Sequence, residues 1–425
     1  MTPNPDPSPH RSRLVDGSPV YYGWFVLLAG TLGMMATLPG QTTGVSIFLD
    51  HLIADLGLTR SGVSTLYLVG TLTGSLALPF VGRFVDRRGP RLAVVLIAAA
   101  FALACAWMGL VQDAFMLLIG FTLVRALGQG SLSLVSVHVI AIWFVRRRGL
   151  AIGMAGVGMA LATATVPTAI EALIQATDWR TAYLILGGIV AVTILPVGAL
   201  VFRDRPERYG VTVDGGTAPG AKDVASTERT YTAAQARGTA TFWIFVVALF
   251  LGSMLGTGLV FHHYSILAEG GLDRLDAALA FVYFGLASST GNLATGALLG
   301  RVAPRHLLAA SLVALAAALA FAAVLRGPAA VLPYGLLLGL RTGIVTSLQG
   351  NVFAHYFGRR YLGSVKGSVT TLMVVGSALG PLLFGLGYDQ FGDYRAVLLA
   401  SAVPAALLAV VVPFVPMVRA DGSVR

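Results

Sequence analysis

The stretch Gly82-Arg-Phe-Val-Asp-Arg-Arg-Gly-Pro-Arg91 decides the fold, because it recurs further along the chain. It lies between two long apolar runs and holds one carboxylate, four guanidinium groups and two glycines. A degenerate copy, Gly296-Ala-Leu-Leu-Gly-Arg-Val-Ala-Pro-Arg305, keeps a Gly, two Arg and the Pro in register but has lost Asp86. The segments Ile53–Leu58 and Leu267–Leu272 repeat at the same offset. We infer that the chain is one module used twice.

The composition requires a lipid environment for most of the chain. A soluble domain is about half apolar and a quarter charged, whereas this chain of 425 residues is 56% apolar and 11% charged. It is long enough for twelve helices of about 20 residues, the length that crosses a bilayer. The predicted spans are 22–48, 61–81, 91–111, 114–140, 149–172, 180–202, 242–267, 276–299, 305–325, 328–354, 362–386 and 395–418. Pro39-Gly40, Pro167 and Gly380-Pro381 fall inside spans and are predicted to kink them.

The repeated stretch resembles the best-known signature of the major facilitator superfamily of secondary transporters, Gly-x-x-x-Asp-Arg-x-Gly-x-Arg. The residues that match it are Gly82, Asp86, Arg87, Gly89 and Arg91. The resemblance implies an all-α membrane protein whose twelve transmembrane helices form two pseudo-symmetric six-helix bundles. The expected boundaries are a disordered cytoplasmic tail at 1–20, bundles at 21–203 and 242–418, a cytoplasmic linker at 204–241 and a tail at 419–425. One such unit is expected to function as a monomer.

Basic residues indicate the orientation in the membrane. The chain has 29 Lys and Arg residues, of which two lie in the middle of spans. The predicted outer loops hold only Arg60, Arg180, Arg274, Arg326 and Arg395. All the others lie in the inner segments, so we expect a multi-pass protein of the cell inner (plasma) membrane with both termini in the cytoplasm. The net charge of +10 is scattered through short loops and does not form the single basic face that binds nucleic acid.

The two mid-span cations are Arg125 in the fourth span and Arg341 in the tenth, which are equivalent helices of the two halves. An intramembrane Arg costs at least about 2.5–3.5 kcal/mol, so each is expected to face a polar or watery interior. In the family that the chain resembles, these two spans line the central cavity. Arg125, Gln129, Ser133 and Ser136 form a polar stripe at α-helical spacing. No Asp or Glu lies at comparable depth in the predicted spans.

Two mid-depth cations without an anion indicate a site for a carboxylate or another organic anion, held by forked Arg hydrogen bonds. The further candidate binding residues are Gln41, Tyr264, Asn292 and Gln349. A second interpretation stays open, in which each Arg satisfies helix carbonyls and only braces its own bundle.

Proton coupling and gating have separate candidates. His262 and His263 lie near the outer end of the seventh span, and histidine titrates near neutral pH; polar residues that simply end a helix would give the same pattern. The signature stretch 82–91 is expected to act as a latch that holds the bundles together on the cytoplasmic side when the cavity faces outward. Arginines that only enforce topology would not explain Asp86 and Gly89.

The leading hypothesis is a secondary active transporter of a small organic anion, a mono- or dicarboxylate, working by alternating access with proton symport or exchange. Tyr22-Gly23-Trp24 and Asp178-Trp179-Arg180 resemble the monocarboxylate and oxalate transporter branch. Ser288 and Asn292, however, stand where animal monocarboxylate transporters carry an Asp/Arg pair. The alternatives are an efflux antiporter for a hydrophobic or drug-like compound, which would need a mid-membrane acid, and a non-transporting membrane sensor.

Enzymatic chemistry has no candidate motif in the chain. The sequence contains no Gly-x-x-x-x-Gly-Lys-Ser/Thr phosphate loop, no His-Glu-x-x-His metal site and no Gly-x-Ser-x-Gly nucleophile elbow. We therefore expect neither an enzyme nor an ATP-driven transporter, and no metal or cofactor. The expected partners are a small anionic substrate and the membrane lipid.

Overall fold

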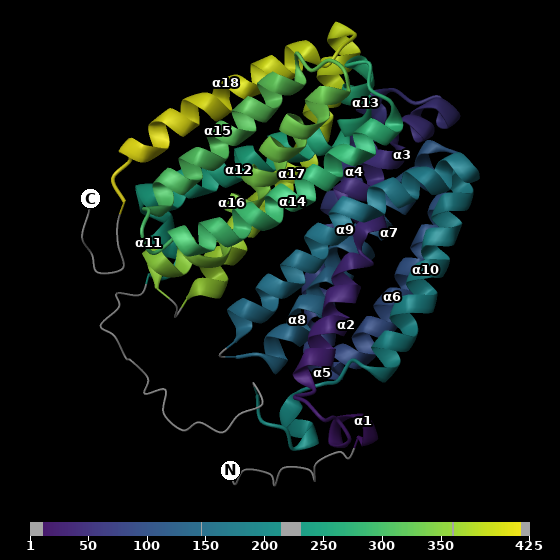
Figure 1. Cartoon of the computed structure of the whole chain (residues 1–425), viewed down its shortest axis with the longest axis vertical. Helices are drawn as coiled ribbons and strands as arrows, with labels where there is room; N and C mark the ends of the chain where they lie inside the picture. Colours follow the sequence, from purple (N-terminus) through teal and green to yellow (C-terminus); the bar gives the residue numbers. More distant parts are fainter. Residues whose placement is uncertain (1–11, 146, 214–230, 359–360, 418–425) are drawn as a thin grey trace.

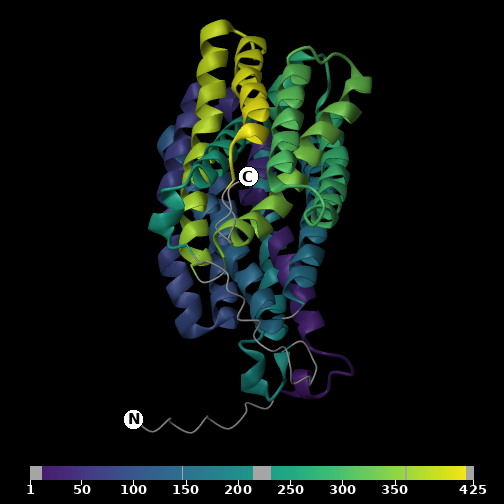
Figure 2. The same ribbon diagram turned by 90° about the vertical axis from the view of Figure 1, so that its left-hand side faces the viewer.

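Twelve helices within the described residues are long and apolar enough to cross a membrane. They form two bundles that meet at an angle (Figure 1). In the side view the helices of both bundles run in roughly the same direction (Figure 2). The computed structural model describes residues 12–145, 147–213, 231–358 and 361–417. The predicted tail 419–425, the start of the predicted tail 1–20 and the middle of the predicted linker lie outside these ranges.

The first bundle holds six spans, some of which are built from more than one helix. Its elements are α2 (Gly23–Met35), η1 (Leu38–Gly40) and α3 (Thr42–Leu56), α4 (Arg60–Ser75) and α5 (Leu78–Arg88), α6 (Pro90–Gly109), α7 (Ala114–Val124), the π-helix η2 (Arg125–Leu132) and α8 (Ser133–Trp143), α9 (Arg148–Ala176) and α10 (Trp179–Leu200). The first two spans run about seven or eight residues beyond the predicted 22–48 and 61–81, because their ends are polar helix rather than loop.

The second bundle repeats this plan. Its elements are α12 (Ala240–Phe261), α13 (His263–Glu269), α14 (Arg274–Leu298), α15 (Pro304–Ala322), η5 (Pro328–Ala330) and α16 (Val331–Phe357), α17 (Leu362–Phe391), and α18 (Arg395–Val411) with η6 (Val412–Phe414). The predicted seventh span 242–267 is divided at His262, where α12 ends. Pro167 and Pro381 lie inside α9 and α17 without ending them, whereas Pro39 and Gly40 form the short turn η1.

We name the two faces of the molecule by an acid on each: the Asp50 side, where α3 ends, and the Asp86 side, where α5 ends. Three helices that begin on the Asp50 side carry aspartate caps. Asp113, Asp178 and Asp273 accept hydrogen bonds from backbone N–H groups in the first turns of α7, α10 and α14. Such caps satisfy donors that have no partner within the helix, so these spans start at defined residues.

The bundles contact each other through reciprocal helix pairs. Helix α9 of the first bundle packs against α14 of the second, and α17 of the second packs against α4 of the first. Each pair joins the fifth span of one repeat to the second span of the other, so the two pairs are equivalent to each other, as a pseudo-symmetric arrangement requires.

The segments outside the spans are partly helical. Within the predicted tail 1–20, residues Arg13–Asp16 form the single turn α1, and Val15 is buried. This departs from the expected disorder of the tail, because Val15 joins the apolar core of the first bundle. Within the predicted linker, η3 (Pro206–Tyr209) and α11 (Ala233–Arg237) flank a stretch outside the described residues.

Helices α12 and α17 approach each other through glycine. A Cβ atom on Gly380 would run into the carbonyl oxygen of Met254, and one on Gly258 would lie 2.8 Å from the carbonyl oxygen of Gly380. Small residues allow such close packing where lipid removes the usual hydrophobic drive for helix association.

We expect Gly380→Val to destabilise the second bundle, because overpacking a close contact costs about 1–3 kcal/mol. The measurement is the midpoint of thermal unfolding of detergent-solubilised protein, followed by the loss of the monodisperse peak. Gly367→Val is the matched control, since it lies on the same helix and a Cβ there meets nothing within 4 Å. Equal midpoints for the two variants would contradict the close-packing assignment.

Candidate functional site

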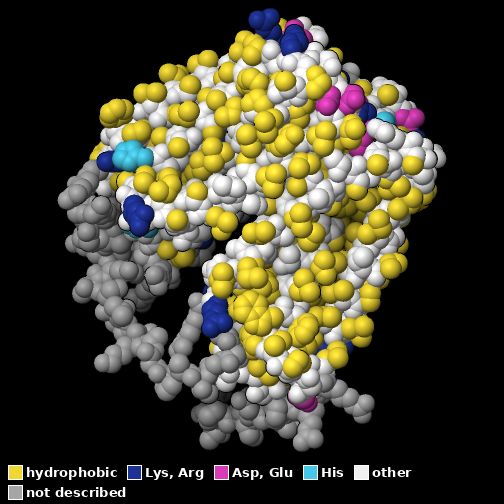
Figure 3. Space-filling view, in the orientation of Figure 1, with side chains coloured by type: hydrophobic (Ala, Val, Ile, Leu, Met, Phe, Trp, Pro, Cys, Tyr) yellow, Lys and Arg dark blue, Asp and Glu magenta, His cyan; other side chains and the backbone are white. Residues whose placement is uncertain are grey.

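A cavity of about 750 Å³ lies between the bundles and opens on the Asp86 side. Its wall runs from Arg125 in the middle of the fourth span to Asp86 at the end of α5, and α17 contributes Val374 and Ser377 from the opposite bundle. The space-filling view shows the hollow between the two bundles, whose visible outer surfaces are mainly hydrophobic (Figure 3). Any solute that reaches Arg125 in this conformation therefore enters from the Asp86 side.

Arg125 lies at the deep end of this cavity and is 4% exposed. Its Nε donates to Thr71 Oγ1 at 3.1 Å, and its Nη1 donates to the carbonyl of Gly40 at 3.2 Å and to Thr42 Oγ1 at 3.4 Å. The guanidinium carbon lies 4.8 Å from the centre of the Tyr67 ring, a cation–π contact. These contacts hold the group in place without an acid.

The Nη2 atom of Arg125 makes no hydrogen bond with the described residues, and no described Asp or Glu forms an ion pair with this side chain. A guanidinium has five N–H donors in a planar fork, so donors remain for a ligand. The break at η1 contributes to this geometry. Gly40 precedes Gln41, the N-cap residue of α3, so its carbonyl lies outside the hydrogen bonds of that helix and can accept from Arg125.

The π-helix η2 sets which residues of the fourth span face the cavity. Arg125, Gln129, Ser133, Val137 and Ala141 all line it, in steps of four residues. In an α-helix each such step advances about 40° beyond a full turn, so the stripe would leave the cavity wall. A π turn holds more residues per turn, and the η2 segment therefore offsets this drift.

The predicted stripe placed Ser136 after Ser133 on the assumption of an uninterrupted α-helix, and this placement is wrong. Ser136 is buried against α2, where a Cβ on Gly33 would meet its Oγ atom. The π turns shift the register, and His138 joins the cavity wall instead. Gln129 does line the cavity, and its Oε1 is buried without a hydrogen-bond partner.

The other uncharged candidates lie outside this cavity. Gln41 Nε2 donates to Thr37 Oγ1 at 3.1 Å, and Gln349 Nε2 lies 3.5 Å from the sulfur of Met373. Asn292 faces α9, since a Cβ on Gly156 would lie 4.0 Å from its Nδ2. Tyr264 is buried near the Asp50 side. The structure therefore brings only Arg125 and Gln129 of the predicted binding set into one cavity.

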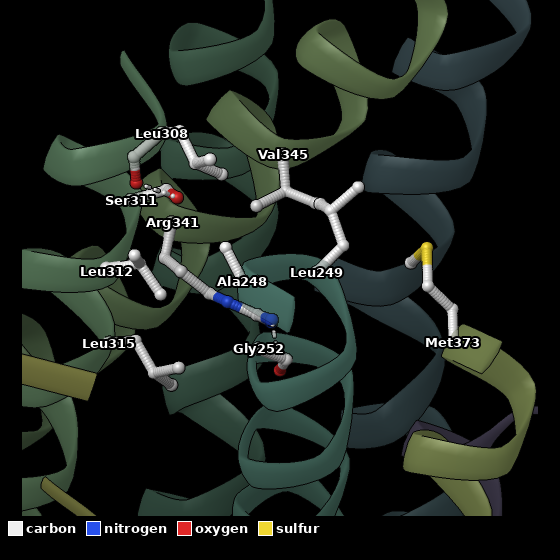
Figure 4. Close-up of a pocket in the computed structure, with 10 residues that line it drawn as sticks. All are labelled: Ala248, Leu249, Gly252, Leu308, Ser311, Leu312, Leu315, Arg341, Val345 and Met373. Carbon is white, nitrogen blue, oxygen red and sulfur yellow. Dashed lines mark hydrogen bonds between the residues drawn. The ribbon is translucent and has the colours of Figure 1, made fainter. Parts of the chain in front are cut away.

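Arg341 lies in a separate space of about 20 Å³, large enough for about one water molecule. Its Nη2 donates to the carbonyl oxygen of Gly252 on α12. Figure 4 shows the guanidinium directed at Gly252, with Leu249 beside it and Met373 across the space. Arg341 and Arg125, although equivalent in the repeat, do not share a site in this conformation.

His262 and His263 are fully buried, and each has a partner for both ring nitrogens. His262 Nε2 donates to the carbonyl of Pro381 at 2.9 Å, and the Tyr394 hydroxyl lies 2.8 Å from Nδ1. His263 Nε2 donates to the carbonyl of Ala277 at 2.8 Å, while the Tyr334 hydroxyl lies 3.2 Å from Nδ1. A carbonyl only accepts, so Nε2 of each ring carries a hydrogen, and neither ring lines the 750 Å³ cavity.

The Asp50 side is closed by polar contacts between the bundles. Arg274 of α14 donates through Nε to both oxygens of Glu171 on α9, at 2.8 and 3.0 Å, and Glu171 is 1% exposed. Ser265 of α13 donates to Asp50 Oδ1 at 2.6 Å and accepts from Arg60 at 2.6 Å. Arg60 also pairs with Asp50 at 2.9 Å. We call these five residues the Asp50-side lock.

The signature residues 82–91 lie on the opposite side, at the open end of the cavity. Gly82 and Asp86 line the cavity itself. Asp86, Arg87 and Gly89 line an adjoining space of about 630 Å³, which we call the mouth pocket. Arg91 donates through Nε and Nη2 to the carbonyl of Ala199, at 2.9 and 2.7 Å, and so ties α6 to α10 within one bundle.

Gly89 joins α5 to α6 at a positive φ of 82°, a conformation that glycine adopts without strain. A Cβ at this position would also collide with the carboxylate of Asp204, which follows α10. Among the described residues Asp86 forms no ion pair, so the predicted latch is not engaged while the cavity is open on this side.

A model of the family described as Major Facilitator Superfamily matches residues 24–270 and 263–424. The chain belongs to the major facilitator superfamily. Its relatives include a probable nitrate/nitrite transporter, NarK2, of Mycobacterium tuberculosis, 29% identical over 84% of this chain and 87% of the relative. Monocarboxylate transporter 12-B of Danio rerio is 25% identical, and the match covers 89% of this chain and 84% of the relative. The oxalate:formate antiporter of Oxalobacter formigenes is 24% identical, and the match covers 53% of this chain and 51% of the relative.

The fold agrees with a solved major facilitator structure. A bacterial homologue of the human lysosomal transporter Spinster, in an inward-facing and unoccupied conformation, superposes with a TM-score of 0.70 at 16% identity. The match covers 92% of this chain and 95% of the other. The twelve-helix, two-bundle fold expected from the sequence is therefore confirmed.

Sequence reasoning missed two parts of this major facilitator protein. The Asp50-side lock joins residues far apart in the chain, and its arginines were read only as outer-loop charges. A signal existed, since Arg60 and Arg274 begin equivalent helices of the two repeats. His138 was missed because its position on the cavity wall depends on the π-helix, which the apolar pattern does not reveal.

We expect Glu171→Gln to loosen the Asp50-side lock and to populate a conformation open on that side. Arg274 is 29% exposed and still has Asp50 at 3.8 Å as a second partner. We therefore expect the free-energy difference between the closed and the open conformation to change by about 1–2 kcal/mol, which is a factor of roughly 5–30 in the ratio of their populations. The measurement is the distance between spin labels at Ala54→Cys and Ala329→Cys, exposed residues of the two bundles on this side. The native Cys105 is buried.

Asp276→Asn is the control for this measurement. Asp276 lies two residues from Arg274 and forms no ion pair among the described residues. Its removal should leave the distance distribution unchanged. A Glu171→Gln distribution identical to that of the unsubstituted protein would show that the lock does not hold the bundles together.

Proposed function

We propose that this protein is a secondary active transporter of a small organic anion, which binds at Arg125 in the central cavity. The observation that carries the proposal is a buried guanidinium with a free Nη2 at the deep end of a cavity of about 750 Å³. A charge at this depth costs several kcal/mol unless it is compensated. No described acid compensates it, so an anion that enters the cavity gains both a charge partner and hydrogen bonds.

The charge of the site favours a monovalent anion within the mono- and dicarboxylate class. Arg125 is the only cation among the residues that line the cavity. Arg341 is turned to the carbonyl of Gly252 in its own small space. A dianion would bring one uncompensated charge into the membrane interior. We assign Arg341 to the role of bracing α16 against α12.

The names of the relatives support an anionic substrate. NarK2 is named for nitrate and nitrite, the Oxalobacter formigenes protein for oxalate and formate, and the Danio rerio protein for monocarboxylates. These names share small anions of one or two negative charges. An efflux antiporter for a cationic compound would need an acid deep in the cavity, where the described wall has Arg125 instead.

The transport cycle in this proposal alternates between two closures. Because loops rich in Lys and Arg stay in the cytoplasm, we place both termini and the Asp86 side on the cytoplasmic face of the cell inner membrane. In this orientation the cavity is open to the cytoplasm. The Asp50-side lock closes the outside. When the Asp50-side lock opens, the anion can leave or enter from the outer face, while Asp86 and the other residues of the signature stretch close the cytoplasmic face. The unit works as a monomer, without a cofactor.

We expect Arg125→Gln to weaken anion transport strongly, because a hydrogen bond to a charged group contributes about 1.5–3 kcal/mol, roughly a 10- to 150-fold rise in KM. The measurement is uptake of a panel of mono- and dicarboxylates into proteoliposomes, with and without an inward proton gradient. Monocarboxylates should be preferred. Arg125→Lys should recover only part of the loss, since it keeps the charge but not the fork.

Arg341→Gln is the matched comparison, a mid-span Arg in the equivalent helix. We expect it to lower the midpoint of thermal unfolding while the KM of the remaining transport stays close to that of the unsubstituted protein. If Arg341→Gln raises the KM as much as Arg125→Gln does, both arginines bind the anion and the assignment of Arg341 as a brace is wrong. Unchanged uptake by Arg125→Gln would overturn the proposed binding site.

A further inference from the structure

His138 is the one histidine on the wall of the central cavity. It lies on α8 and lines both the cavity and the mouth pocket, so water on the Asp86 side reaches it. Neither of its ring nitrogens forms a hydrogen bond with the described residues. His262 and His263, in contrast, are sealed in the protein with both nitrogens satisfied. His138 can therefore accept a proton without breaking an existing hydrogen bond.

The charged groups around His138 come from three elements. From α5, Asp86 lines both spaces and has no ion-pair partner among the described residues. From the segment after α10, Arg205 lines the mouth pocket. The other charged residues of the mouth pocket are Arg87, Asp204, Glu207 and Arg208.

Three further features define the electrostatics of the mouth. Asp204 and Arg208 pair with each other at 3.2 Å, which neutralises both. Arg125 lies 13 residues earlier on the same span, roughly 20 Å away at helical rise. On the opposite bundle, the cavity wall consists of Val374 and Ser377, which carry no charge. Among the described acids, Asp86 alone lines both spaces together with His138, whereas Glu207 lines only the mouth pocket and is exposed.

Closing the mouth would remove both groups from the water of the cavity and of the mouth pocket. With His138 neutral, closure takes the carboxylate of Asp86 out of water without a partner, which is costly. With His138 protonated, the imidazolium and the carboxylate can pair as they lose water. The proton moves from a hydronium ion on the Asp86 side to a ring nitrogen: one O–H bond breaks, one N–H bond forms, and a water molecule is left.

We propose that His138 is the proton-binding group of this cavity and that it pairs with Asp86 when the mouth closes. The inference rests on the proposed function, because it requires a carrier that alternates between a state closed on the Asp50 side and a state closed on the Asp86 side. Its sign is defined: acidification favours the state closed on the Asp86 side, and opening of that side favours release of the proton. Proton and anion are then coupled through the conformation of the carrier and not by contact between them.

The test is a distance across the mouth in the substrate-free protein. Spin labels at Leu150→Cys and Gly300→Cys lie on the two bundles at the Asp86 side, and the native Cys105 is buried. Between about pH 8 and pH 5, the range in which histidine titrates, the short-distance population of the otherwise unsubstituted protein should grow as the pH falls. His138→Gln and Asp86→Asn should each abolish this shift.

Two more variants complete the design. His138→Arg carries a fixed positive charge and should show the short distance at every pH. His355→Gln removes an exposed histidine at the end of α16, outside both spaces, and should keep the pH response. A His138→Gln protein with the same pH response as the unsubstituted protein, or no response in the latter, overturns the inference.

Failure of the proposed function gives a different result. If the proteoliposomes take up none of the tested anions while the distances still respond to pH through His138, the assignment of the substrate is wrong and the proton site stands. If anions are taken up through Arg125 but the distances do not change with pH, the proton site is wrong and the anion site stands.

Discussion

A guanidinium without an acid partner inside the membrane is the constraint on which the first bundle depends. Arg125 is held by Thr71, Thr42, the Gly40 carbonyl and the face of Tyr67. The turn η1 exposes that carbonyl, and the π-helix η2 begins at Arg125 itself. Irregular backbone at membrane depth is tolerated only where protein or a cavity satisfies it, and both irregular segments meet at this one side chain. The geometry of the helices and the position of the charge therefore support each other.

The two sides of the molecule differ in how they are closed. On the Asp50 side, acids and arginines from both bundles compensate one another, and Glu171 is buried with Arg274. On the Asp86 side, Asp86 lacks an ion-pair partner among the described residues while the cavity is open. A two-state carrier needs such an asymmetry, because each closure must be stable in one conformation and breakable in the other. A single half-buried pair such as Arg60 and Asp50 contributes modestly, so the lock depends on several contacts acting together.

The span count, the duplication and the family could be predicted from the sequence, because hydrophobic length and a repeated motif are local properties. The deep position of Arg125 followed in the same way. What the sequence did not reveal were properties of the folded chain. The π turns changed the register after Arg125, which removed Ser136 from the cavity wall and added His138. The pairing of Glu171 with Arg274 joins positions about a hundred residues apart, and no spacing rule reports such a contact.

The repeat makes the contrast between Arg125 and Arg341 informative. Both lie in the middle of equivalent spans, yet one lines a cavity of about 750 Å³ and the other a space of about 20 Å³. The tenth span is the uninterrupted α-helix α16, and its Arg341 stays within its own bundle against α12. The fourth span contains η2, which turns its polar residues toward the space between the bundles. The same residue type at the same depth thus has different surroundings because one helix departs from α geometry. A duplicated carrier that placed both cations in the cavity would suit a dianion, whereas the single described cation of this cavity suits the monovalent anion that we propose.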